Sequence, residues 1–136
     1  MIPSLVVRPT EVEQLGQVVK RCYEEGIPMT VRGSGTNLTG GTIPDCSDTI
    51  VILTTGLNKI LEINTEDLYA TVQPGVITAK FAAAVAAKGL FYPPDPGSMS
   101  VSTIGGNVAE AQAACAAQVR HDQRLRHGHG SLRQHR

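Results

Sequence analysis

The hydrophobic residues near the start of the chain have the spacing of a helix with one buried face. Thr10 and Glu13 are spaced as a capping box, and Gly26 suits the end of a helix. A helix is therefore predicted over residues 10–25. We expect the apolar face of this helix to pack inward, because its residues recur every three to four positions. The face consists of Val12, Leu15, Val18, Val19 and Cys22.

The pattern after this helix is that of extended strands. Residues 27–31 form a short apolar run, and TIVILTT at 49–55 is a continuous one, typical of a strand buried on both faces. Residues 59–63 and 68–73 alternate between apolar and polar side chains on either side of a polar turn, which predicts a hairpin. A brief extended piece is expected at 90–92.

A second helix is predicted at residues 76–88, which are rich in alanine and are followed by Gly89. Further on, Gly105 and Gly106 precede a helix-like segment at 107–110. The order of elements is typical of an α/β or α+β domain. We expect a small mixed sheet with the two longer helices packed on it, and a glycine-rich loop after the strand at 27–31.

Composition narrows the function classes. The 136 residues include 12 Lys and Arg and 12 Asp and Glu, so the formal net charge is zero and no basic surface favours nucleic acid. No apolar run reaches the roughly 18 residues of a membrane span, and the first residues lack a signal-peptide pattern, so we expect a cytoplasmic protein. Cys22, Cys46 and Cys115 have no CxxC spacing, which argues against a disulfide framework or a zinc knuckle.

Two glycine-rich segments carry the candidate chemistry: VRGSGTNLTGG at 31–41 and PPDPGSMSVSTIGG at 93–106. Each alone is compatible with a structural loop. Together they are able to form a cradle of backbone N–H groups for a phosphorylated ligand, since glycine lets the backbone approach an anion. The first segment departs from the GxGxxG dinucleotide fingerprint, and neither supplies the lysine of a P-loop.

These segments, with RPTEVEQL at 8–15 and ATVQPGV at 70–76, resemble a known family in sequence and order. The family is the PCMH-type FAD-binding domain shared by vanillyl-alcohol oxidase, p-cresol methylhydroxylase and D-lactate dehydrogenase flavoproteins. The resemblance is closest to the flavoprotein subunit of glycolate oxidase. It implies FAD as cofactor and oxidation of a small 2-hydroxy acid, such as glycolate or D-lactate, by hydride transfer. It also implies partner subunits of a glycolate oxidase complex.

The resemblance further implies which residues bind FAD. The first loop is expected to wrap the pyrophosphate, and the second segment to lie near the flavin and its ribityl chain. Some relatives attach flavin through a histidine of the first loop, where this chain has Thr36 and Asn37, so non-covalent FAD is expected. The implied residues are Arg32, Gly33, Ser34, Gly35, Thr36 and Asn37, then Pro94, Asp95, Pro96, Gly97, Ser98, Thr103, Gly105, Gly106 and Asn107.

Several of these side chains also have purely structural interpretations. Arg32 at a strand end is compatible with a solvated charge, and Asp95 among prolines with a turn residue. Ser98 and Thr103 are able to close local turns instead of donating to a ligand. No catalytic residue is assigned, because the four histidines match no family motif. The pair in HGH at 127–129 is able to bind zinc or nickel, but no metal site is assigned because no third ligand is placed.

The resemblance covers residues 1–110 as a partial FAD-binding domain and leaves 111–136 as a tail outside the family pattern. Enzymes of this family are much longer, so we expect a truncated chain that lacks the catalytic half. The alternative function is a stand-alone phosphate- or nucleotide-binding module without redox activity. A third possibility is an inert product that does not fold. The tail is rich in Arg, His and Gly, which is typical of disorder.

We hypothesise that the tail is translated from a shifted reading frame. QVRHDQRLRHGHGSL at 118–132 can be encoded so that reading one base later gives KYGMTSDYVMGMEV, which is similar to the family's continuation. Sequencing of the gene is expected to reveal a single-base change, after the codon for Glu110, whose reversal restores KYG and DYV. If no single-base change restores them, the hypothesis is wrong.

Overall fold

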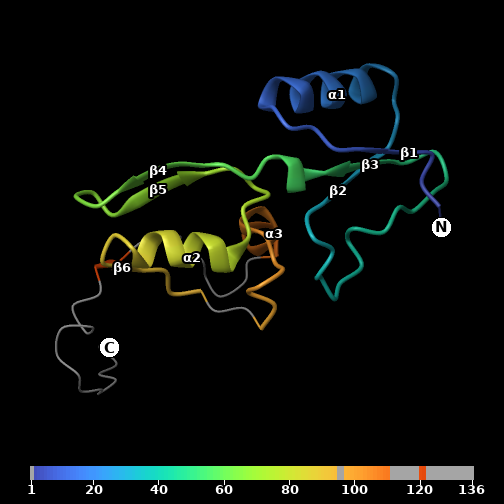
Figure 1. Cartoon of the computed structure of the whole chain (residues 1–136). Helices are drawn as coiled ribbons and strands as arrows, with labels where there is room; N and C mark the ends of the chain where they lie inside the picture. Colours follow the sequence, from blue (N-terminus) through green and yellow to red (C-terminus); the bar gives the residue numbers. More distant parts are fainter. Residues whose placement is uncertain (1, 95–96, 111–119, 122–136) are drawn as a thin grey trace, which may run out of the picture.

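The structure is a computed structural model that describes residues 2–94, 97–110 and 120–121. The chain forms short strands and helices (Figure 1). In chain order they are β1 (Leu5–Val7), α1 (Val12–Glu24), β2 (Met29–Arg32), β3 (Ile50–Leu53), the 3-10 turn η1 (Thr54–Gly56), β4 (Ile60–Asn64), β5 (Tyr69–Val72), α2 (Thr78–Ala86), β6 (Leu90–Phe91), α3 (Ile104–Ala109) and β7 (Arg120–His121).

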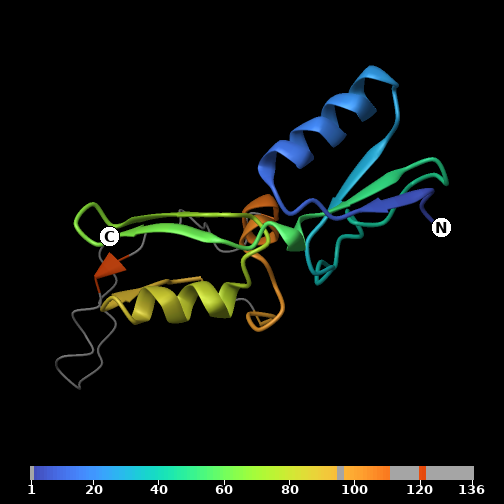
Figure 2. The ribbon, with the colours of Figure 1, turned by 45° about the horizontal axis from the view of Figure 1, so that its top comes forward.

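A parallel sheet in the order β1-β3-β2 forms the N-terminal half. Its central strand is the apolar run that the sequence predicts to be buried, and Val51 and Ile52 are indeed buried. Parallel strands place their carboxyl ends at one edge. The loop that follows β2 starts from this edge and lies on the side of the sheet opposite α1 (Figures 1 and 2).

Helix α1 confirms the predicted helix but not its capping box. The Gln14 side chain, rather than Glu13, turns back to the start of the helix, where its Oε1 accepts from the N–H groups of Thr10 (3.0 Å) and Glu11 (3.3 Å). Glu11, which has extended backbone angles, is therefore the N-cap residue. The first turn of the helix consequently begins one residue later than a box built on Thr10 would place it.

The predicted inward face of α1 is only partly correct. Cys22 is buried and Leu15 and Val18 are half-buried, but Val12 and Val19 are exposed. The reason is the size of the neighbouring sheet, whose strands are three or four residues long. Such a sheet covers only part of a helix of 13 residues.

The α/β or α+β class is confirmed. The strands of the described residues form three small sheets instead of the one mixed sheet that the sequence predicts. The predicted hairpin is the antiparallel pair β4–β5. Its turn is held by Asn64, whose Oδ1 accepts from the N–H groups of Glu66 and Asp67, both at 2.9 Å. The 3-10 turn η1 interrupts the chain between β3 and β4, so the hairpin leaves the parallel sheet.

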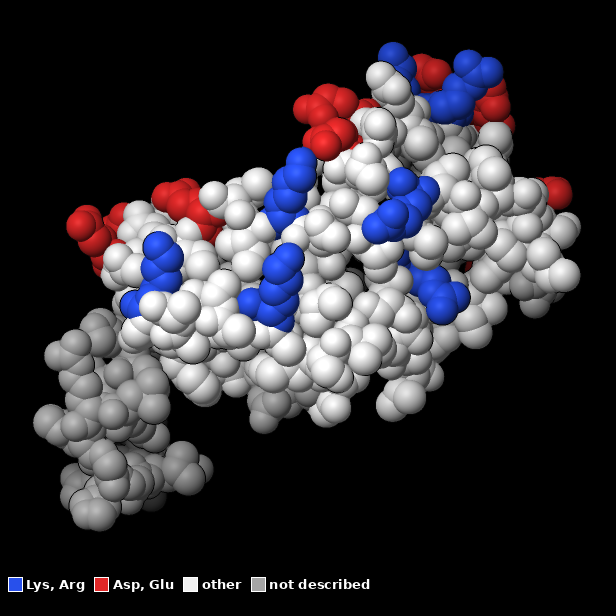
Figure 3. Space-filling model, in the orientation of Figure 1, with Lys and Arg blue, Asp and Glu red and all other residues white. Residues whose placement is uncertain are grey.

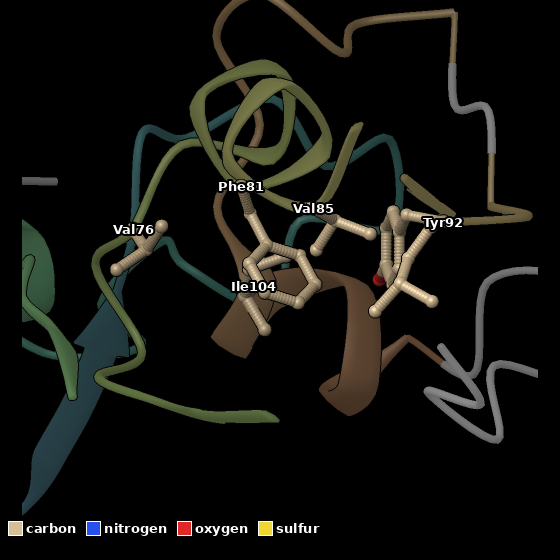
Figure 4. Close-up of a cluster of buried hydrophobic side chains, with 6 residues drawn as sticks. Val76, Phe81, Val85, Tyr92 and Ile104 are labelled. Atoms are coloured by element: carbon tan, nitrogen blue, oxygen red, sulfur yellow. The ribbon is translucent and has the colours of Figure 1, made fainter. Parts of the chain in front are cut away.

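The main hydrophobic cluster lies between the hairpin and α2, which run side by side (Figures 1 and 2). Phe81 and Val85 point from α2 toward Ile104 of α3 (Figure 4). The rings of Phe81 and Tyr92 meet edge to face, with centroids 4.9 Å apart. This cluster therefore joins α2 to the glycine-rich segment that contains α3.

Helix α2 begins two residues after the start predicted for the second helix, and α3 begins three residues before the predicted segment at 107–110. Ile77 is extended and pairs with Thr103 in an isolated antiparallel bridge, so α2 starts only at Thr78. The N–H of Ile104 donates to the carbonyl of Val76 (2.9 Å), which fixes the first turn of α3. Gly105 and Gly106 consequently lie inside α3, not before it.

Acidic side chains on the face shown in Figure 3 gather over α1 and the hairpin. Within the described ranges, no helix is long and apolar enough to cross a membrane. Cys22 and Cys46 are free thiols, and Cys115 lies outside the described residues. The expected disorder of residues 111–136 also lies outside them, apart from β7, which pairs antiparallel with β6.

Replacing Phe81 with alanine is expected to destabilise the chain strongly, because the side chain is 2% exposed and packs on both Tyr92 and Ile104. We expect the free energy of unfolding to fall by about 3 kcal/mol or more. Urea unfolding followed by circular dichroism measures this change. The neighbouring exposed Lys80→Ala serves as control and should change it by less than about 0.5 kcal/mol. Equal effects of the two substitutions would contradict the assignment of this core.

Candidate functional site

A cleft of about 300 Å³ lies between the loop after β2 and the segment that contains α3. It is built from the two glycine-rich segments. The first wall is formed by Val31, Gly33, Ser34, Gly35, Thr36, Asn37, Thr39, Gly41 and Thr42, and the second by Ser102, Thr103, Gly105, Gly106, Asn107, Ala109 and Glu110.

Direct contacts tie the two walls together. The Ser34 hydroxyl donates to the carbonyl of Val101, and the Thr39 hydroxyl donates to Glu110 Oε1 at 3.2 Å. At Gly33 the approach is closer still, since a Cβ there would lie 2.4 Å from Thr103 Oγ1. Segments about 70 residues apart in sequence therefore share one surface, and glycine is needed where they touch.

The first wall has a fixed conformation. Gly35 has φ +78°, in the left-handed region that favours glycine. In the orientation that satisfies both ends of its amide, Asn37 accepts from the N–H groups of Gly40 and Gly41 (3.1 Å each) and donates to Thr42 Oγ1 (2.9 Å). The loop is thus closed by a side chain of its own rather than by regular structure.

This wall presents backbone donors. Among the described residues, no acceptor takes a hydrogen bond from the N–H groups of Ser34, Gly35 or Thr36. All three residues line the cleft. Successive N–H groups without a protein acceptor are suited to binding an anion.

Arg32 lies beside this wall and not in it. Its guanidinium group packs over Gly35, where Nη2 would be 2.5 Å from an added Cβ. It forms no ion pair within the part of the chain that the structure describes. The side chain borders a neighbouring cleft of about 570 Å³ that shares Gly33, Ser34 and Thr42 with the first. Arg32 therefore adds positive charge next to the backbone donors.

The second wall is held rigidly from behind. Asn107 Nδ2 donates to Thr78 Oγ1 at 2.8 Å, and the Thr78 hydroxyl also lies 2.9 Å from that of Ser102. All three residues are buried. Because buried polar groups are costly unless they are satisfied, this network fixes α3 against the start of α2.

The structure brings together most, but not all, of the residues expected to bind FAD. Nine line the cleft: Gly33, Ser34, Gly35, Thr36, Asn37, Thr103, Gly105, Gly106 and Asn107. Pro94, Gly97 and Ser98 line neither cleft, and the Ser98 carbonyl instead closes a turn by accepting from Val101 and Ser102. Asp95 and Pro96 lie outside the described residues.

Sequence reasoning missed several residues of the site. Thr39 and Gly41 lie within the glycine-rich segment at 31–41 and Thr42 follows it directly, so extending the implied binding residues beyond Asn37 would have included them. Thr78 and Glu110 had no recognisable pattern, since their roles depend on contacts across 29 and 71 positions of sequence.

The lining is suited to binding rather than to acid-base chemistry. Glu110 is its one ionisable side chain among the described residues, and the other polar groups are hydroxyls, amides and backbone N–H groups. Within the described ranges, no group of three His, Cys, Asp or Glu side chains is placed to hold a metal ion. The geometry therefore favours an anionic, hydrogen-bonding ligand.

Comparison with known proteins gives consistent matches. A family model described as FAD binding domain matches residues 3–126. Glycolate oxidase subunit GlcD of Bacillus subtilis (strain 168) is 50% identical over 109 residues, which are 80% of this chain and 23% of that protein. D-lactate dehydrogenase of Anaerostipes hadrus is 39% identical over 107 residues, 79% of this chain and 22% of that protein.

Among solved structures, alkyldihydroxyacetonephosphate synthase is similar with a TM-score of 0.71 and 25% identity, over 76% of this chain and 21% of that one. The chain thus spans less than a quarter of the length of these relatives.

The two adjacent glycines of α3 are expected to respond oppositely to alanine. A Cβ on Gly105 would lie 2.7 Å from Pro74 Cβ and 3.1 Å from the Pro74 carbonyl oxygen, whereas one on Gly106 has Thr103 Oγ1 as its nearest neighbour at 3.5 Å. Both changes gain roughly 0.5–1 kcal/mol of helix propensity. Gly105→Ala should therefore lower the melting temperature, and Gly106→Ala should leave it unchanged or raise it. The reverse order would contradict the close approach of α3 to Pro74.

Proposed function

This chain belongs to the FAD binding domain family, and we propose that it supplies the N-terminal part of the FAD site of a flavin-dependent oxidoreductase. FAD is the cofactor of this domain. The observation that carries the proposal is the row of backbone donors at Ser34, Gly35 and Thr36. The Ser34 hydroxyl bonds this row to Val101 in the segment that contains α3.

The cleft fits part of FAD by its chemistry. A pyrophosphate offers only acceptors, which match backbone N–H groups, and the neighbouring Arg32 adds a positive charge. The volume of about 300 Å³ is at the lower end of ligand pockets and suits a portion of so large a cofactor. No histidine, cysteine or tyrosine is among the described lining residues, which supports a non-covalent mode of binding.

The proposed reaction is oxidation of a 2-hydroxy acid of the glycolate or D-lactate type. When bound, FAD supplies the two-electron oxidant for conversion of the hydroxyl-bearing carbon to a carbonyl. The residues of this chain bind and orient the cofactor through the loop after β2 and through α3. The names of two relatives, glycolate oxidase subunit GlcD and D-lactate dehydrogenase, support this substrate class.

Two further features of the proposal rest on less direct support. We also propose that the chain assembles with partner subunits, because its glycolate oxidase relative is a subunit by name. A cytoplasmic location is proposed from the sequence, since its apolar runs are short and its first residues do not have a signal-peptide pattern. A stand-alone phosphate-binding module, the alternative function, would use the same backbone donors without any preference for flavin.

Purified chain is expected to bind FAD and to lose affinity when the cleft is filled at Gly106. The Cβ of Gly106→Ala has room in the fold but enters the lining of the cleft, so it should compete with the ligand and weaken FAD binding by roughly 10-fold. Quenching of FAD fluorescence measures the affinity, and circular dichroism verifies folding. As a control away from the cleft, the exposed Lys80→Ala should bind FAD like the unchanged chain.

A folded chain that leaves FAD fluorescence unchanged would argue against the proposed function. Equal affinities for FAD and for inorganic pyrophosphate would instead favour the phosphate-binding module.

A further inference from the structure

One side chain does not suit a cleft that only holds phosphate. Glu110 is the one ionisable residue among the described residues that line it. A carboxylate near a pyrophosphate weakens binding by repulsion between like charges. The position of Glu110 in the lining therefore suits a part of the ligand other than its phosphates.

The surroundings of Glu110 do little to neutralise its charge. It takes part in none of the ion pairs among the described residues. It also follows the C-terminal end of α3, where the helix dipole disfavours negative charge. In the free protein the negative charge of Glu110 is thus stabilised by solvent and by one hydroxyl, that of Thr39.

Two contacts place the carboxylate. The backbone N–H of Glu110 donates to the Gly106 carbonyl at 3.0 Å, and Oε1 accepts from Thr39 Oγ1 at 3.2 Å. Glu110 belongs to the second wall of the cleft, whereas the donors of Ser34, Gly35 and Thr36 belong to the first. An ionised carboxylate has about four acceptor sites, so the bond from Thr39 leaves most of them open.

We propose that Glu110 accepts hydrogen bonds from sugar hydroxyls of the bound flavin nucleotide. Hydroxyls are donors that a carboxylate binds well, while phosphate oxygens are acceptors that it repels. The cleft then has two chemically distinct ends, with the pyrophosphate at Ser34 to Thr36 and a sugar at Glu110. Glu110 is thereby a residue that selects a nucleotide over a bare phosphate. This inference rests on the proposed function.

The test compares two ligands on the full chain and on Glu110→Gln. Glutamine keeps the size of the side chain and an acceptor for Thr39 but removes the charge. The dissociation constant for FAD should rise roughly 10-fold, since hydrogen bonds to charged groups are stronger than neutral ones. Inorganic pyrophosphate should bind the variant as tightly as the unchanged chain or more tightly, because repulsion is removed. Fluorescence quenching measures the first affinity and calorimetric titration the second.

The matched control is Glu66→Gln, which removes the same charge from the exposed turn of the hairpin. It should change neither affinity. Melting curves of both variants verify that they fold.

Two further ligands identify the sugar. Weaker binding of ADP to Glu110→Gln assigns the ribose, and weaker binding of riboflavin assigns the ribityl chain. Unchanged or tighter FAD binding by a folded Glu110→Gln overturns the inference while leaving the proposed function intact. A folded, unchanged chain that binds no FAD overturns the proposed function and this inference with it.

Discussion

The close approach of Gly75 to the end of β3 sets the positions of both walls of the cleft. Its N–H donates to the Leu57 carbonyl at 2.7 Å, and an added Cβ would lie 2.1 Å from the Thr54 carbonyl oxygen. Thr54 in turn donates through its hydroxyl to the carbonyl of Arg32, the last residue of β2, directly before Gly33 of the first wall. On the other side, Pro74 accepts from Gly105 in α3. The backbone around Pro74 and Gly75 thus connects the end of the parallel sheet with α3 in the half that contains the hydrophobic cluster.

The two walls are stabilised in different ways, and this suits different tasks. Asn107, Thr78 and Ser102 hold the second wall through buried side-chain hydrogen bonds. The backbone N–H groups of Gly105 and Asn107 in this wall donate to carbonyl oxygens within the protein. The first wall is a loop closed by the half-buried Asn37 and Thr42. The N–H groups of Ser34, Gly35 and Thr36 in this loop have no acceptor among the described residues. These N–H groups belong to half-buried or exposed residues that water reaches. A ligand that accepts from them replaces this water and stabilises the folded chain by binding to it.

The sequence was informative wherever a local pattern determines the structure. The buried strand β3, the β4–β5 hairpin and the two longer helices follow from spacing of apolar residues within a few positions. The capping box of α1 was placed one step wrong, because Glu13 and Gln14 are both able to reach back to the first turn and only geometry distinguishes them. The start of α3 was wrong for a different reason. Glycine disfavours helices on average, and the bond from Gly105 to Pro74 overrides that preference.

In the candidate site, too, the sequence pattern does not distinguish residues that serve the ligand from residues that serve the fold. Glycines that approach a ligand and glycines that approach the protein look alike in sequence, yet Gly33 and Gly105 are required by Thr103 and Pro74, while Gly106 borders open space in the cleft. A motif match therefore assigns to the cofactor some glycines that the fold itself needs. Glu110 illustrates the converse. It belongs to no recognisable motif, yet the fold places it in the cleft beside Thr39. The chemistry of the cleft is consequently set by which donors and acceptors the fold leaves unused, and the sequence pattern alone does not reveal which these are.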